Sequence, residues 1–310
     1  MAGPASDLPQ ALKAPPAPRS RRRFGVRTLG GVLGIFGGSA LLMGYLSLIV
    51  LIPIAAVAAH GLGITVHTNG WGLAFWHWTG TTDFSAFWTN VTNATALRAI
   101  WLSIWLSLAV AAVNAVLGVV IALVLVRDTF PGKRLLEGVI DLPFALPTIV
   151  AGVVIVYLYG QASPVHVNLY ETWMGLFVAL LFVTLPFSVR AVQPVLESFD
   201  GQAEDASRSL GAGGIRTFTS VLLPSLLPAI LTGFGLAFAR AIGEFGSISL
   251  ISGGLGRTTP ASAYIYNLFS DGIPYYSAAA AVSVALLVIS LFLLASTGFA
   301  STRVQRRLSQ

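Results

Sequence analysis

The sequence of 310 residues has no cysteine and few charged side chains. The lack of cysteine excludes disulfide bonds, thiolate metal sites and cysteine nucleophiles. Charged residues make up 10% of the chain, against about 25% in soluble domains. Apolar residues make up 55%. Because 18 basic and 12 acidic side chains do not cover a soluble globule of this size, an ordinary soluble enzyme is excluded.

The sequence also lacks the common nucleotide-binding and hydrolytic motifs. It has no G-x-x-x-x-G-K-[ST] phosphate loop, no H-E-x-x-H and no G-x-S-x-G. We therefore expect no cofactor in this chain and no catalysis by it alone. Any energy that the protein uses must then come from a gradient or from a partner. His67 and His77 are interpreted as solvated loop side chains, and no metal site is predicted.

What the sequence does contain is long apolar runs that separate the few charges. A membrane span needs about 20 mostly apolar residues. Six runs satisfy this, so we predict an all-α polytopic membrane protein with six transmembrane helices. Their expected ranges are 33–57, 99–126, 141–159, 173–192, 222–250 and 277–298.

The basic residues predict the orientation of these spans. Fifteen of them fall on one side and two on the other, which by the positive-inside rule puts both termini in the cytoplasm. The fifteen are Lys13, Arg19, Arg21, Arg22, Arg23, Arg27, Arg127, Lys133, Arg134, Arg190, Arg208, Arg216, Arg303, Arg306 and Arg307. The net charge of +6 is thus a marker of topology, and we expect no nucleic-acid partner.

The predicted organisation is one membrane domain between two tails. Residues 1–28 combine several prolines with an arginine cluster and are expected to form a disordered basic cytoplasmic tail. Residues 29–302 form the transmembrane domain, with a cytoplasmic loop at 193–221, and residues 303–310 form a second basic tail. This pattern predicts multi-pass insertion in a membrane, which we expect to be the plasma membrane.

The loop at 193–221 has an ordered pattern of residue types. Asp205 starts a short amphipathic stretch in which Ala206 and Leu210 share one helical face, and the acid suits the positive end of the helix dipole. Gly211 suits a left-handed C-terminal cap. A short helix of this kind at the membrane surface fits a partner's groove.

This pattern resembles the E-A-A-x3-G-x9-I-x-L-P signature of importer-type ABC-transporter permeases. It aligns as Asp205-Ala206-Ser207, then Gly211, then Val221-x-Leu223-Pro224. Aspartate replaces the family's glutamate, and Ser207 replaces its second alanine. The segments Asp141-Leu-Pro-Phe-Ala-Leu-Pro-Thr148 and Phe238-Ala-Arg-Ala-Ile-Gly-Glu-Phe-Gly-Ser247 are similar to those of sulfate/thiosulfate permease subunits, the first of the two permease chains in particular.

The resemblance implies an ATP-driven importer that works by alternating access. Its partners would be a cytoplasmic ATPase dimer that binds ATP and Mg, a related second permease chain, and an extracytoplasmic sulfate-binding protein. The loop residues Asp205, Ala206, Ser207, Leu210, Gly211, Leu223 and Pro224 would dock the ATPase. A molybdate or tungstate permease of the same class and a gradient-driven secondary anion transporter remain as alternatives.

Arg240 and Glu244 lie four residues apart within the fifth predicted span. Ionisable groups at this depth are expected to pair and to face protein or water. Two interpretations stay open: a structural ion pair, or an arginine that binds the anion with Glu244 as its counter-charge. Thr148 and Ser247 are candidates for hydroxyls along the anion pathway, with helix packing as the other interpretation.

Overall fold

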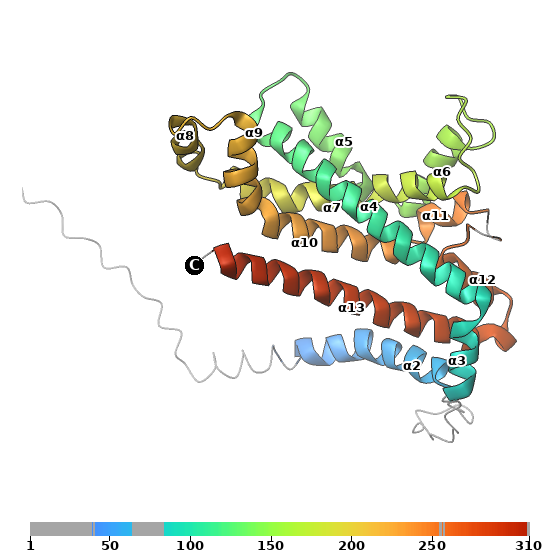
Figure 1. Cartoon of the computed structure of the whole chain (residues 1–310). Helices are drawn as coiled ribbons and strands as arrows, with labels where there is room; N and C mark the ends of the chain where they lie inside the picture. The colour runs from blue at the N-terminus through green and yellow to red at the C-terminus, as the bar shows by residue number, and fades with distance from the viewer. Residues whose placement is uncertain (1–38, 40, 64–83, 254–255, 257, 309–310) are drawn as a thin grey trace, which may run out of the picture. The chain divides into compact units, whose positions relative to one another are not determined.

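The computed structural model describes residues 39, 41–63, 84–253, 256 and 258–308. Every regular element among these residues is helical, in agreement with the all-α prediction (Figure 1). Five helices are long and apolar enough to cross a membrane, and one bent pair of shorter helices is a sixth candidate. The predicted tail 1–28 and the histidines His67 and His77 lie outside the described residues.

The chain divides into two units, residues 1–53 and 54–310. The described part of the first unit belongs to the candidate span Leu41–Gly61 and includes a π-helix, η1 (Ser47–Leu51). The second unit starts within α2 (Ile52–Gly61). It holds every other described element and all the candidate site residues.

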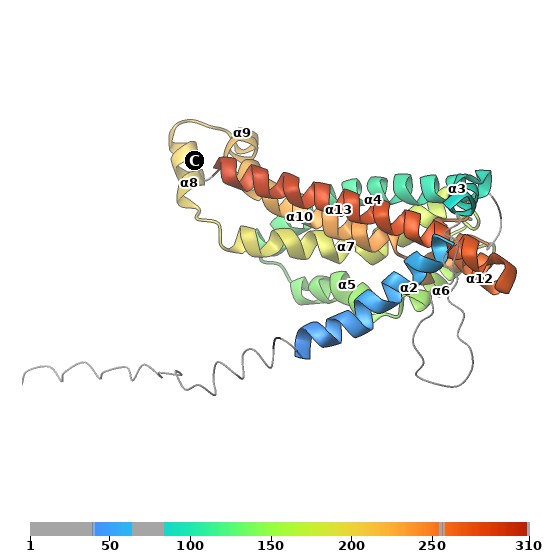
Figure 2. The same cartoon turned by 90° about the horizontal axis from the view of Figure 1, so that it is seen from below.

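Four long helices form the centre of the second unit: α4 (Ala94–Arg127), α7 (Trp173–Glu197), α10 (Leu223–Ile242) and α13 (Tyr276–Leu308). They run side by side in both views (Figures 1 and 2). Small residues bring the backbones close, as is usual in membrane bundles. A Cβ atom on Gly118 of α4 would lie 2.8 Å from Cβ of Ser188 on α7, so only glycine permits this approach.

The third predicted span, 141–159, is two helices rather than one. These are α5 (Lys133–Ala145) and α6 (Thr148–Tyr159), which meet at an angle of 115°. Pro147 has no amide hydrogen for a helical bond, and its ring disfavours a helical conformation at Leu146, which is extended with ψ 132°. The apolar segment therefore starts earlier than predicted and bends at its middle.

The fifth predicted span, 222–250, is wrong at its C-terminal end. Helix α10 stops at Ile242, and a separate short helix, α11 (Gly246–Ile251), follows after Gly243–Phe245. The buried carboxylate of Glu244 accepts a hydrogen bond from the amide of Ser247 (2.9 Å) and so starts α11 instead of continuing α10. The predicted spans 99–126, 173–192 and 277–298 lie within α4, α7 and α13, and α13 continues into the predicted tail 303–310 as far as Leu308. The first predicted span, 33–57, begins outside the described residues, and its described part belongs to a helical segment that ends at Gly61.

The remaining elements lie at the two ends of the second unit. At one end are α8 (Gln202–Ser209), α9 (Gly214–Thr217), the π-helix η2 (Phe218–Leu222) and the C-terminal end of α13 (Figures 1 and 2). At the other end are α3 (Phe84–Thr92), α12 (Ala261–Ser270) and η3 (Ile273–Tyr275). The loop predicted at 193–221 thus holds two short helices that protrude from the bundle.

Candidate functional site

Helix α8 is ended by a left-handed glycine, as the sequence predicts. Gly211 has φ +84°, and its amide donates to the carbonyl of Arg208 (2.9 Å). The next amide, of Ala212, donates to the carbonyl of Ser207 (3.1 Å). These bonds satisfy carbonyls that the last turn of a helix leaves open. The turn reverses the chain and places α9 beside α8.

The reversal leaves an apolar knob at the tip of the loop. We define it as Leu210, Ile215 and the glycine-rich turn 211–214 between them. Leu210 is 89% exposed and Ile215 is 83% exposed. The tip of the loop therefore exposes two large apolar side chains beside a turn without bulky groups.

The other predicted docking residues divide into two groups. Asp205 and Ala206 are exposed on α8, near the knob, whereas Ser207 is half-buried and its hydroxyl lies 3.2 Å from that of Thr217. Leu223 and Pro224 lie at the start of α10 and are half-buried, so they belong to the helix that follows the loop. The motif therefore spans the tip of the loop and its connection to the bundle.

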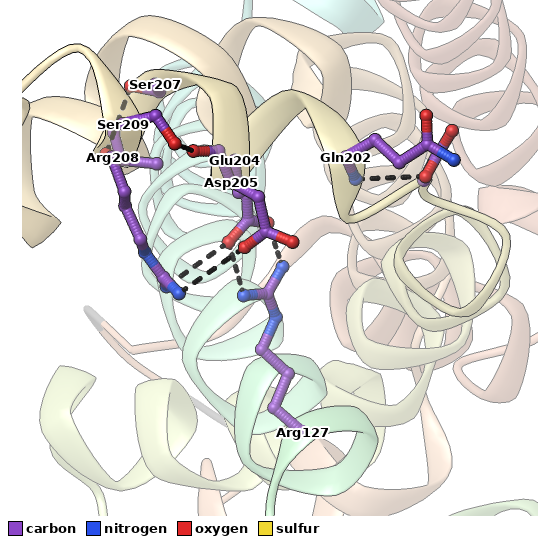
Figure 3. A network of polar contacts seen from close by, with 9 residues as sticks. Arg127, Gln202, Glu204, Asp205, Ser207, Arg208 and Ser209 are labelled. Carbon is purple, nitrogen blue, oxygen red and sulfur yellow. Dashed lines mark hydrogen bonds and ion pairs between the residues drawn. The ribbon is translucent and has the colours of Figure 1, made fainter.

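The acid that anchors α8 is Glu204, the neighbour of the motif's Asp205. Its two carboxylate oxygens accept hydrogen bonds from both terminal nitrogens of Arg127, one of them at 2.8 Å (Figure 3). Arg208 adds a second cation 3.7 Å from Glu204. Hydrogen bonds from Arg127 hold the pKa of Glu204 below its ordinary value, although burial acts in the opposite direction.

Sequence reasoning missed the pair between Glu204 and Arg127 because it ranked the two acids by motif alignment. The Glu204 side chain is 7% exposed, whereas that of Asp205 is 78% exposed. Helical periodicity carries the signal that distinguishes them. Glu204 shares a helical face with Ser207 and Arg208, three and four residues later. Asp205, the next residue along the helix, lies on a neighbouring face that is exposed.

The intramembrane candidates come together where α10 ends. Arg240 forms an ion pair with Oε2 of Glu244, as predicted from their spacing. Oε1 of Glu244 accepts from the amide (2.9 Å) and the hydroxyl (3.1 Å) of Ser247. Glu244 is buried, whereas the Arg240 side chain keeps 31% of its surface exposed. Both carboxylate oxygens of Glu244 are thus used in contacts at the break between α10 and α11. The exposed part of the Arg240 side chain can make another contact.

Thr148 joins this cluster through the close approach of α6 and α11. A Cβ atom on Gly246 would lie 2.2 Å from Oγ1 of Thr148, so the hydroxyl rests directly on that glycine. Ser247 is fully buried, with its hydroxyl directed to Glu244. The structure therefore places Thr148, Arg240, Glu244 and Ser247 in one neighbourhood, in which Thr148 and Arg240 are half-buried and Glu244 and Ser247 are buried.

A second charged cluster, which the sequence analysis did not single out, joins α5 to α7. Nε of Arg190 donates to Asp141 at 2.9 Å, and a second nitrogen binds the other carboxylate oxygen. Arg190 also donates to Gln193 (2.5 Å), which in turn donates to Glu197 (2.9 Å). Asp141 and Arg190 both fall at the edges of apolar runs, where a charge predicts a partner.

Three comparisons relate the chain to known proteins. The family described as "Binding-protein-dependent transport system inner membrane component" matches residues 114–308. The sulfate transport system permease protein CysT of Salmonella typhimurium is 35% identical over 232 residues, which cover 73% of this chain and 83% of that protein. The protein of the same name from Synechocystis sp. is 38% identical over 258 residues, covering 81% and 83%.

Solved structures share the fold at low sequence identity. A bacterial ABC transporter involved in the import of the acidic polysaccharide alginate has a TM-score of 0.68 at 15% identity, covering 87% of this chain and 96% of that chain. The MetNI methionine ABC transporter has a TM-score of 0.51 at 20% identity, covering 71% and 100%. The chain belongs to the family of binding-protein-dependent transport system inner membrane components.

Proposed function

We propose that this chain is a permease subunit of an ATP-driven importer that moves sulfate or thiosulfate across the plasma membrane by alternating access. The names of its relatives support the substrate, and the fold of the alginate and methionine transporters supports the class. The partners are a cytoplasmic ATPase dimer that binds ATP and Mg, a second permease chain and an extracytoplasmic binding protein.

The observation that carries ATPase docking is the apolar knob. Leu210 and Ile215 are exposed next to α8 and in α9. At the same end of the second unit α4 ends and α13 ends (Figure 1), and these helix ends carry Arg127, Arg306 and Arg307. Because basic residues collect on the cytoplasmic side, this end faces the cytoplasm in our proposal, with both termini inside. The knob is therefore accessible to a cytoplasmic ATPase.

Arg240 is our candidate for contact with the anion. Its guanidinium is planar and presents several donors, which suits a tetrahedral oxyanion. Glu244 holds the arginine from one side, and the exposed part of the side chain is available to a passing anion. The hydroxyls of Thr148 and Ser247 shape the same neighbourhood, but Ser247 is occupied by Glu244.

The docking role is tested by Gly211→Asp, which adds charge and a strained backbone at the knob. An added side chain at Gly211 meets no atom within 4 Å, but φ +84° disfavours any residue with a Cβ. We expect ATP-coupled uptake to be abolished, with membrane insertion unchanged. Wild-type uptake by this variant overturns the docking assignment.

Gly201→Asp is the matched control for charge and size. Gly201 lies at the N-terminal end of the same helix with φ −63°, and its added side chain also meets no atom within 4 Å. Aspartate is favoured at a helix N-cap. We expect this variant to insert, bind the ATPase and import at close to the wild-type rate.

A further inference from the structure

Helix α8 is attached to the bundle at two points of different chemistry. Glu204 binds Arg127, the last residue of α4, through two parallel hydrogen bonds (Figure 3). On the other side, the hydroxyl of Ser207 contacts that of Thr217, which leads through η2 into α10. The knob between these attachments is exposed.

The two adjacent acids of α8 differ in exposure, although both lie within 4.0 Å of Arg208. Asp205 faces water, and its only cation contact among the described ion pairs is Arg208 at 4.0 Å on its own helix. Glu204 faces the bundle with almost no exposure and binds a different helix. The exposed Asp205 carboxylate is available to a partner, whereas the Glu204 carboxylate, 7% exposed, is covered by its contact with Arg127, which is itself 38% exposed.

The contact between Glu204 and Arg127 is suited to transmit a displacement of α8 to α4. A bidentate arginine–carboxylate contact fixes orientation as well as distance, because two parallel bonds resist rotation. Helix α4 has 34 residues and is therefore about 50 Å long. It packs against α7 and α10 in the centre of the second unit, so a displacement of its end moves a span rather than a loop.

We propose that Glu204 and Arg127 are positioning residues that transmit movement of α8 to the span α4, whereas Asp205 and the apolar knob make the contact with the ATPase. This inference rests on the proposed function. It assigns different tasks to two neighbouring acids that a motif alignment treats as one position.

The test measures ATP hydrolysis by the assembled transporter in proteoliposomes, with and without its loaded binding protein. The ratio of the two rates reports a signal that passes from the outer face to the ATPase. For Glu204→Gln we expect the ATPase to co-purify within twofold of the wild-type amount and the basal rate to persist. The stimulation ratio should fall at least fivefold, because the amide keeps the shape but loses the ion pair.

Asp205→Asn is the matched control, with the same chemical change one residue away. We expect it to weaken ATPase association at least threefold in a titration, while the complexes that do form keep the wild-type stimulation ratio. The exchanged pair Arg127→Glu with Glu204→Arg should restore the stimulation ratio to within threefold of wild type, because it recreates the contact with opposite polarity.

Three results overturn the inference. One is an unchanged stimulation ratio in Glu204→Gln. A merely structural role gives the same result, because a smaller amount of folded protein lowers the basal and the stimulated ATPase rate by the same factor. Another is weaker ATPase association in Glu204→Gln than in Asp205→Asn. The third is an exchanged pair no better than the single variants. The stimulation ratio does not depend on which anion is carried. If the wild-type transporter fails to take up sulfate, the proposed substrate is rejected, and the role of Glu204 and Arg127 is still decided by the stimulation ratio.

Discussion

Glu204 is the residue whose surroundings depart furthest from a sequence-based expectation. Its lowered pKa comes first from the hydrogen bonds of Arg127, with further help from the charges of Arg127 and Arg208. A carboxyl whose pKa is lower in the folded than in the unfolded state stabilises the fold fully above its unfolded pKa. That contribution disappears as the pH falls through the lowered, folded value.

We therefore expect α8 to loosen on acidification. At neutral pH the pair is complete, and below the ordinary carboxyl range the amides of 202–209 should lose protection from hydrogen exchange after correction for intrinsic rates. Glu204→Gln should show low protection with little pH dependence over the same range. An identical pH profile in the two proteins contradicts the role given to this carboxylate.

The pair of Asp141 and Arg190 allows a second prediction for single residues. Asp141→Asn leaves the Arg190 guanidinium without its bidentate partner. Breaking a fully buried pair costs about 3–5 kcal/mol. Here we expect about 1–2 kcal/mol, because the two side chains are 41% and 34% exposed and solvent screens part of the interaction.

A lower thermal midpoint of the detergent-purified protein measures this effect. Glu137→Gln is the control, since it makes the same change one turn earlier on α5, at a residue with no direct hydrogen bond to Arg190 among the described contacts. Equal midpoints for Asp141→Asn and Glu137→Gln contradict the assignment of Asp141 as the partner that matters.

Among the elements, α6 and α11 approach each other closely at Gly246. A Cβ atom on Gly246 would lie 2.2 Å from Oγ1 of Thr148 and 2.9 Å from the amide of Ile149. Because one of these atoms is backbone, Gly246→Ala must push the helices apart, at a cost of about 1–3 kcal/mol for overpacking.

Gly138→Ala in α5 provides the contrast. An added Cβ there meets no atom within 4 Å, and alanine is favoured over glycine in a helix interior by about 0.5–1 kcal/mol. We expect a lower thermal midpoint for Gly246→Ala and an equal or higher one for Gly138→Ala. Two variants with unchanged midpoints speak against the tight packing of α6 on α11.

The sequence predicts the helical elements well where apolar length alone defines them. The range 173–192 lies within α7, and 99–126 lies within α4, because long uncharged runs have few other solutions in a membrane. It fails where the helix breaks inside an apolar run. The break between α10 and α11 depends on Glu244 accepting the amide of Ser247, which is a tertiary arrangement that hydrophobicity does not report.

In the candidate site, the sequence predicts the contacts between residues close in sequence and misses those between distant residues. Spacing alone identifies the ion pair of Arg240 and Glu244 and the cap at Gly211. The contacts of Glu204 with Arg127 and of Asp141 with Arg190 join residues 77 and 49 positions apart. Without the packing of α4, α5 and α7, nothing in the local sequence selects those partners.

At the scale of the whole molecule, the expected orientation has a direct test, because the chain has no cysteine of its own. Ala162, in the loop between α6 and α7, and Thr129, between α4 and α5, are both exposed. In intact spheroplasts an impermeant maleimide should label Ala162→Cys at once, and Thr129→Cys only after permeabilisation. The reverse pattern places the knob outside and rules out a cytoplasmic motor there.

The central claim is that this chain carries sulfate with the help of an ATPase. The most direct measurement is uptake of labelled sulfate by a strain that lacks its own sulfate importers and expresses this chain with its partner subunits. We predict uptake that requires ATP hydrolysis, is competed by thiosulfate, and is little affected by equimolar molybdate. Strong competition by molybdate contradicts the substrate assignment, and full uptake with an ATPase-deficient partner contradicts an ATP-driven importer in favour of a gradient-driven transporter.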